Sequence, residues 1–363
     1  MVTDSQNQYQ PDFVTPPGET LQDTLDSLGM SQTELAQRTG KHKKTINAIV
    51  KCKQEITPET ALQLEKVLGV PASFWNNRQK RYDEFLAKAE ETQRLKKQEN
   101  WLREFPLKEM KKHKYIDDKD DSVSLMEKIL KLMGVASPSA FQVHLHKLSI
   151  QYRKSSAFKV NQYALAAWLS KGRELALAMR CKPYDRKGFR QSLKKIKNMT
   201  DPLPHNFVTE LQNICAENGV KVVFVPELPR MPVYGATYWI SDNPVIQLNI
   251  RGKKDDILWF TFFHEAGHVL LHEKKKAVFL DVDKREGIEE EKANLFATEM
   301  LIPRRELEAF INSAQHLSYD NILQFAQQQG IAPGIVVGQL HHFGYAPYKN
   351  FQKLRRSLKW MND

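Results

Sequence analysis

Cysteine is scarce in this chain of 363 residues, and its distribution excludes two common kinds of small scaffold. The three cysteines, Cys52, Cys181 and Cys215, lie far apart, and no Cys-x-x-Cys pair occurs. An odd and scattered set argues against a disulfide framework and against a cysteine-based zinc knuckle. We therefore expect a protein of a reducing compartment, which indicates a cytoplasmic location.

Long apolar runs are also missing. No stretch is long and apolar enough to cross a bilayer. The first residues, "MVTDSQNQYQPDF", contain neither the basic segment nor the apolar core of a signal peptide. We expect no membrane partner and a loose polar arm over residues 1–17.

Strand signals are absent from the middle of the chain, where residues 82–202 favour successive helices. Residues 78–200 hold 29 Lys and Arg against 14 Asp and Glu, whereas both flanking parts are slightly acidic. Such an excess is typical either of solvated helical faces or of a nucleic-acid surface, and the sequence leaves both open. A basic helical middle region is therefore predicted.

Residues 18–81 predict an all-α domain of five short helices. Ser31 with Glu34 forms a capping-box pattern, and Thr57 followed by Pro58 is typical of another helix start. The second and third helices, joined by a short turn, match a helix-turn-helix. The outward residues at the start of the third helix are candidate DNA contacts: His42, Lys43, Lys44 and Asn47. The alternative is a helical bundle used only for protein contacts.

The stretch "TFFHEAGHVLLHE" has the pattern of a zinc site on a helix. His264 and His268 are one helical turn apart, so both imidazoles can reach one tetrahedral Zn²⁺. Glu265, between them, is placed to accept a proton from a metal-bound water. Alternatives are a buried helix with satisfied histidines, or a zinc site that cuts no peptide.

A third ligand is expected from the following helix, in "EEEKANLFA". Glu290 and Asn294 are four residues apart, so Glu290 can bind the metal while Asn294 orients a ligand histidine. Glu291 is the rival ligand, because the frame shifts easily in a run of three glutamates.

Residues 203–345 predict an α+β domain with a small antiparallel sheet, followed by a tail over residues 346–363. Tyr234 and Tyr238, in "YGATYWI", are candidates to stabilise a developing oxyanion, although a core role is equally open. The whole chain is therefore predicted to be multidomain and mostly α.

"FFHEAGHVLLH" followed by "EEEKANLFATEMLIP" resembles the ImmA/IrrE family of zinc metallo-endopeptidases. The resemblance implies a gluzincin-like fold, an intracellular bacterial or phage protein, and activity against helix-turn-helix repressors. The segments "MSQTELAQRTG" and "ITPETALQLEKVLG" resemble the XRE-type domain of HigA-like antitoxins. Two positions depart from that pattern. Cys52 replaces the glycine that usually follows the recognition helix, and His42 replaces a Ser-type cap.

Together these patterns predict a DNA-binding regulator fused to a zinc endopeptidase. Its expected partners are operator DNA and a protein substrate, a repressor or antitoxin, with a homodimer as a further expectation. The alternative is a non-enzymatic HigA-like antitoxin or repressor whose zinc domain senses a signal or binds a partner. A third hypothesis is a peptidase whose helix-turn-helix only docks the substrate or dimerises.

Overall fold

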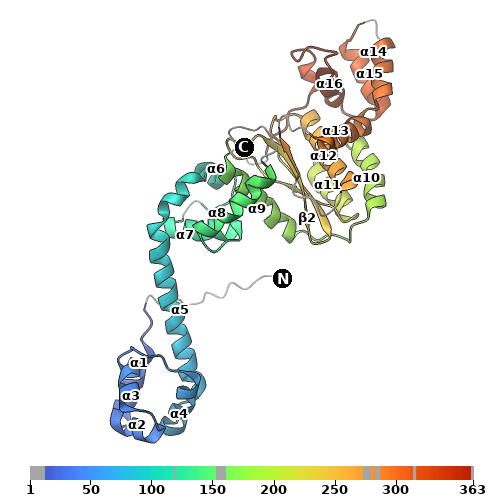
Figure 1. Ribbon diagram of the computed structural model, residues 1–363. Helices are drawn as coiled ribbons and strands as arrows, with labels where there is room; N and C mark the ends of the chain where they lie inside the picture. Colours follow the sequence, from blue (N-terminus) through green and yellow to red (C-terminus); the bar gives the residue numbers. More distant parts are fainter. Residues whose placement is uncertain are drawn as a thin grey trace. The chain divides into compact units, whose positions relative to one another are not determined.

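A computed structural model describes residues 13–117, 120–152, 161–272, 279–282, 287–313 and 316–360. Its contacts divide the chain into two compact units, Met1–Gln98 and Glu99–Asp363 (Figure 1). Each unit holds a separate cluster of buried apolar side chains. Within the described ranges, no helix combines the length and apolar character needed to span a membrane. The predicted class, multidomain and mostly α, is confirmed.

The first unit consists of five helices: α1 (Pro17–Ser27), α2 (Gln32–Thr39), α3 (Lys43–Val50), α4 (Pro58–Leu68) and α5 (Ala72–Lys97). The predicted capping residues form the expected bonds, because Ser31 Oγ accepts from the Glu34 amide and Thr57 Oγ1 accepts from the Thr60 amide. Cys52 has a φ of 55°, in the left-handed region that favours glycine. This backbone conformation explains why glycine usually occupies the position that Cys52 has in this chain.

The fifth helix continues well past the predicted domain end at residue 81. Its 26 residues contain no glycine or proline, and Glu84 and Arg94 each pair with a charged neighbour one turn away. The predicted boundaries at residues 81, 202 and 345 stay predictions. Most of the predicted arm lies outside the described residues.

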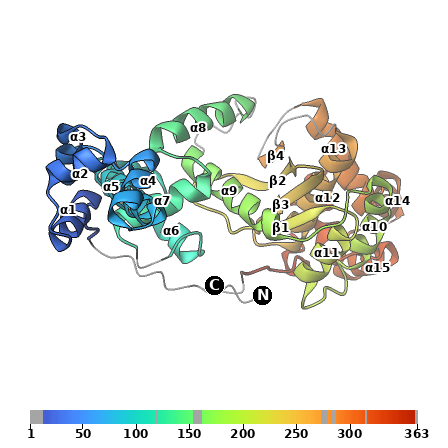
Figure 2. The same ribbon diagram turned by 90° about the horizontal axis from the view of Figure 1, so that it is seen from below.

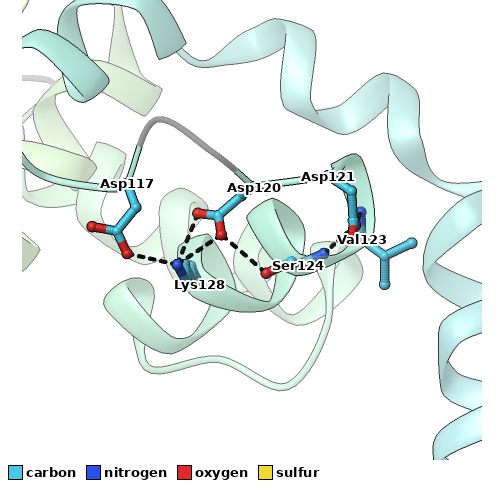
Figure 3. Close-up of polar contacts among 6 residues, drawn as sticks. All are labelled: Asp117, Asp120, Asp121, Val123, Ser124 and Lys128. Atoms are coloured by element: carbon cyan, nitrogen blue, oxygen red, sulfur yellow. Dashed lines mark hydrogen bonds and ion pairs between the residues drawn. The ribbon is translucent and has the colours of Figure 1, made fainter. Parts of the chain in front are cut away.

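The middle of the chain is helical, as expected, and belongs to the second unit from Glu99 onward. Its elements are η1 (Glu99–Glu104), α6 (Leu107–Lys112), α7 (Ser122–Met133), α8 (Pro138–Tyr152), α9 (Gln162–Ala178) and α10 (Arg186–Asn198). Figure 3 shows how α7 begins: Asp121 Oδ1 accepts from the amides of Val123 and Ser124. Lys128 then pairs with Asp117 at 2.7 Å and with Asp120 at 2.8 Å.

A four-stranded sheet forms the centre of the second unit, after α11 (Phe207–Ala216). Its strands are β1 (Lys221–Phe224), β2 (Val233–Ile240), β3 (Asn243–Leu248) and β4 (Phe279–Val282). The order is β1-β3-β2-β4, and β2 is antiparallel to both of its neighbours. The β1–β3 pair is parallel, so the expected antiparallel sheet is wrong for that pair. After β1 the chain crosses the position that β3 will occupy and forms β2. It then turns back and forms β3 between β1 and β2.

Helices cover both faces of this sheet (Figures 1 and 2). α12 (Asp255–Leu271) lies on one face, where Thr237 contacts Glu265. α9 lies on the other face, where Gln247 donates to the Trp168 carbonyl. Along each strand the side chains alternate between these two faces.

The C-terminal helices are α13 (Ile288–Leu301), α14 (Arg304–Ser313), α15 (Tyr319–Gln329), α16 (Pro333–His342) and the short η2 (Gln352–Leu354). Of these, α13 and α16 pack against α12, and α15 packs against α16. The segment after η2 is fixed to the start of α12. Arg355 pairs with Asp256 at 2.8 Å with both side chains buried, and the Asp255 amide donates to the Arg356 carbonyl.

Arg355→Ala should destabilise the second unit by about 3 kcal/mol, because it leaves the buried Asp256 carboxylate without its charge partner. Arg356→Ala is the matched control. Arg356 pairs with Asp201 at 3.2 Å near the surface, and its loss should cost less than about 1 kcal/mol. Guanidinium unfolding followed by tryptophan fluorescence measures both. Equal midpoints for the two variants would contradict the role of the buried pair.

Candidate metal centre

The candidate metal centre lies where α12 packs against α13. Gly267 permits the close approach of the two helices, because a Cβ at that position would lie 3.2 Å from the Ala293 Cα. His264 and His268 project from α12 toward Glu290 of α13, and all three side chains are buried. This packing brings residues from two separate segments of sequence to one point.

The three side chains present donor atoms at the spacing of a tetrahedral metal site. His264 Nε2 lies 3.0 Å from His268 Nε2, and Glu290 Oε2 lies 3.3 Å and 3.5 Å from these two atoms. Tetrahedral Zn²⁺ with nitrogen ligands at 2.0–2.1 Å separates its donor atoms by about 3.3 Å. Two imidazoles and a carboxylate therefore fit a divalent cation. They form the one such group of three or more His, Cys, Asp or Glu side chains among the described residues.

The protonation of the histidines suits metal binding. Asn294 Oδ1 lies 2.8 Å from His264 Nδ1, so Nδ1 donates to this amide and Nε2 keeps its lone pair. Burial lowers the pKa of His268 to about 4, which keeps this imidazole neutral near pH 7. Neutral imidazoles are the form that binds a metal.

Glu265 is fully buried beside this cluster and is held by a residue that the sequence analysis missed. The Thr237 hydroxyl donates to Glu265 Oε2 at 2.6 Å. Gly235 lies on the same face of β2, where a Cβ would come within 2.7 Å of Glu265 Oε1. The strand alternation of "YGATYWI" could have placed Gly235 and Thr237 on one face, but nothing in it pointed to Glu265.

The structure distinguishes the two rival glutamates by position. Glu290 is buried with the histidines, whereas Glu291, one residue later on α13, is exposed. Asn294 follows Glu290 by one helical turn and contacts His264. The roles of these residues as ligands and as an orienting group stay predictions.

The two candidate tyrosines are separated by the sheet. The Tyr238 hydroxyl donates to Gln247 Oε1, on the face of the sheet that α9 covers. Neighbouring residues of a strand point to opposite faces, and Thr237 faces Glu265. Tyr238 therefore faces away from the candidate metal centre, which corrects the expectation that it stabilises an oxyanion there. Tyr234, at a register shift between Val233 and Gly235, remains on the side of α12.

A cavity of about 260 Å³ opens beside the N-terminal half of α12. Tyr234, Phe260 and Thr261 line it together with residues of α13 and α16, including Leu301 and His342. The Phe260 ring centroid lies 6.4 Å from that of His264, so the cavity adjoins the metal-centre helix. Aliphatic and aromatic side chains form most of its walls.

The predicted DNA contacts all lie at the start of α3. His42, Lys43 and Lys44 are exposed, and His42 precedes the helix without forming a side-chain cap. Asn47 is half-buried and donates its amide to Gln32 Oε1 of α2 at 3.2 Å. Contacts of these four residues with bases or phosphates stay predictions.

Two family models match the chain, and they match different units. Residues 215–336 match Peptidase M78, described as the IrrE N-terminal-like domain, and residues 21–75 match the helix-turn-helix family. The N-terminal domain therefore belongs to the helix-turn-helix transcriptional regulators, and the C-terminal domain is similar to the Peptidase M78 family. Both predicted resemblances are confirmed.

Similar proteins match the N-terminal part. The uncharacterized HTH-type transcriptional regulator YddM of Escherichia coli (strain K12) is 34% identical over 76 residues, which cover 21% of this chain and 79% of YddM. An addiction module antidote protein of a HigA family from Coxiella burnetii is 33% identical. That match covers 23% of this chain and 91% of the antidote protein, with a TM-score of 0.22.

The purified chain should bind about one zinc ion, and Glu290→Ala should abolish this binding because it removes one of three converging donor atoms. Glu291→Ala is the matched control, since that side chain is exposed, and should retain the metal. Elemental analysis after dialysis and readdition of Zn²⁺ measures both. Metal retained by Glu290→Ala and lost by Glu291→Ala would reverse the assignment of the third ligand.

Proposed function

We propose that this protein is a DNA-binding transcriptional regulator fused to a zinc-dependent endopeptidase that cleaves a repressor or antitoxin-type protein. The observation that carries the proposal is the convergence of His264, His268 and Glu290 beside the buried Glu265. These groups supply a metal site and a proton acceptor in one chain with a helix-turn-helix domain.

The proposed chemistry assigns a separate task to each side chain. When bound, the Zn²⁺ would lower the pKa of a water and polarise the peptide carbonyl. Glu265 accepts the proton of the attacking water and delivers it to the leaving amine. Thr237, through its 2.6 Å hydrogen bond, holds the Glu265 carboxylate in one orientation while Asn294 holds His264.

The surroundings of the site support a peptide as substrate. The cavity beside Phe260 and Leu301 offers apolar walls for a substrate side chain, and Phe260 lies one helical turn from His264. Tyr234 lines the same cavity from β2 and is the remaining candidate to stabilise an oxyanion. The DNA-binding domain would bring this site to an operator, where repressors of the helix-turn-helix type are concentrated.

Glu265→Gln should lower peptide cleavage by about 10²–10⁴-fold, because the amide has nearly the same size but cannot accept the proton. The variant should keep its zinc and its thermal stability. Quantitative proteomics of cells expressing the wild type or the variant identifies candidate substrates, and cleavage of each is then measured with purified proteins.

The control is Glu291→Gln, which makes the same substitution at an exposed glutamate outside the metal centre. This variant should cleave at the wild-type rate. Cleavage by Glu265→Gln at the wild-type rate would remove this residue from the mechanism. Relief of repression by wild type without any cleavage product would favour the non-enzymatic HigA-like regulator instead.

Binding of the chain to its own promoter region should weaken steeply with salt, because lysine contacts to phosphates release counterions. Lys43→Ala combined with Lys44→Ala should lower the salt slope by about two and weaken binding to all sequences. Asn47→Ala should instead reduce the preference for the operator over unrelated DNA. Electrophoretic mobility shifts over a salt series measure all three effects.

The matched control is Lys80→Ala, which removes an exposed lysine from α5, outside the helix-turn-helix. An unchanged salt slope in the Lys43 and Lys44 variant would show that the start of α3 does not contact DNA. The helix-turn-helix would then serve as a docking or dimerising module.

A further inference from the structure

A second and larger hollow lies on the face of the sheet opposite the candidate metal centre. It is a groove of about 960 Å³ between the segment that follows α6, α7 and α9, with Tyr238 of β2 at its base. We call it the basic groove. Its volume is at the upper end of the 300–1,000 Å³ range of small-molecule sites. Nothing in the proposed peptidase chemistry uses it.

The basic groove carries an excess of positive charge. Its wall holds five cationic side chains: Lys114, Lys128, Lys131, Lys171 and Arg173. Two acidic side chains, Asp117 and Glu174, face them. Lys128 is neutralised by Asp117 and Asp120, as Figure 3 shows, and Lys171 lies 3.1 Å from Glu174.

Three cations of the groove remain without an acidic partner in the described part of the chain. Lys114, Lys131 and Arg173 make no ion pair there, and all three are exposed at the wall. Lys114 lies just after α6, Lys131 lies on α7 and Arg173 lies on α9, so three separate segments each place one cation around the same groove. Unpaired cations that surround a concavity attract anions, because their fields add inside it.

The base of the groove is apolar. Met133 of α7, Ala166 and Leu169 of α9, and the ring of Tyr238 lie among the lining residues. A nucleic-acid duplex is bound by charges on an accessible surface, and its paired, stacked bases cannot pack into a recessed apolar base. A compact anion with a flat apolar body matches both the cations at the wall and the apolar base.

We propose that the basic groove binds a small organic phosphate with an aromatic body, of which a mononucleotide is the plainest example. Lys114, Lys131 and Arg173 contact the phosphate groups, and the aromatic body packs against Met133 and Tyr238. The groove is thus a ligand site separate from the peptidase centre and from the DNA-binding helix.

Isothermal titration calorimetry of the full chain tests the proposal with ATP, AMP, ribose 5-phosphate and inorganic phosphate as probes. ATP should bind at one site per chain and more tightly than AMP, because it brings more negative charge. AMP should bind at least about tenfold more tightly than ribose 5-phosphate or inorganic phosphate, which lack the aromatic body. Affinity should fall as salt screens the lysines.

Charge-reversal variants locate the site. Lys131→Glu and Arg173→Glu should each weaken ATP binding by about tenfold or more, with an unchanged melting temperature because both side chains are exposed. Arg190→Glu is the matched control. It makes the same charge change on the exposed face of α10, outside the groove, and should bind ATP like wild type. Lys43→Ala with Lys44→Ala should also bind ATP normally.

Three results would overturn the proposal. The first is no saturable binding of any nucleotide by the wild type up to millimolar concentration. The second is an equal loss of binding in Arg190→Glu and Arg173→Glu, which would indicate attraction by net charge alone. The third is binding of a single-stranded oligonucleotide over tenfold more tightly than ATP, together with loss of that binding in Lys131→Glu. This result would assign the groove to nucleic acid.

Discussion

The burial of polar groups along α12 is the constraint on which the second unit depends. Nearly every residue of this helix from Leu258 to Leu270 is buried, and two histidines and one glutamate are among them. A buried carboxylate or imidazole is costly unless it is hydrogen bonded or bound to a cation. Each of these groups must therefore obtain a partner from an element that packs against α12.

The packing of unit 2 supplies those partners from three directions. β2 contributes Thr237 to Glu265, and α13 contributes Glu290 and Asn294 to the histidines. At the N-terminal end of α12, the chain after η2 contributes Arg355 to the buried Asp256. The same interactions that make the burial of α12 tolerable also orient the groups that a metal site requires.

Sequence reasoning reaches furthest where the arrangement of side chains follows from local spacing. One turn of helix fixes the neighbourhood of His264 and His268, and the next helix could be searched for a glutamate and an amide at the same spacing. Capping at Ser31 and Thr57 is local as well. These features need no knowledge of how distant segments meet.

The missed features all depend on contacts between distant segments. Thr237 and Glu265 are 28 residues apart, and Arg355 and Asp256 are 99 apart, so no periodicity relates them. Tyr238 was misplaced because strand alternation gives two faces without saying which one α12 covers. The parallel β1–β3 pair depends on the order of the strands in space, which single-strand patterns do not encode.

β2 is the wall that the candidate metal centre and the basic groove share. Thr237 on one face holds Glu265, and Tyr238 on the other face lines the groove, so consecutive residues of one strand belong to two sites. Energetic coupling between such sites requires an element with two discrete arrangements. At the register shift between Val233 and Gly235, β2 leaves regular pairing with β4, and Tyr234 lies within this shift. Thr237 and Tyr238 follow Gly235 by two and three residues. The pairing of β2 with β3 is regular from Gly235 to Ile240 and therefore has no comparable freedom to rearrange. A ligand in the basic groove that alters the position of Glu265 must therefore act through the irregular pairing of β2 with β4.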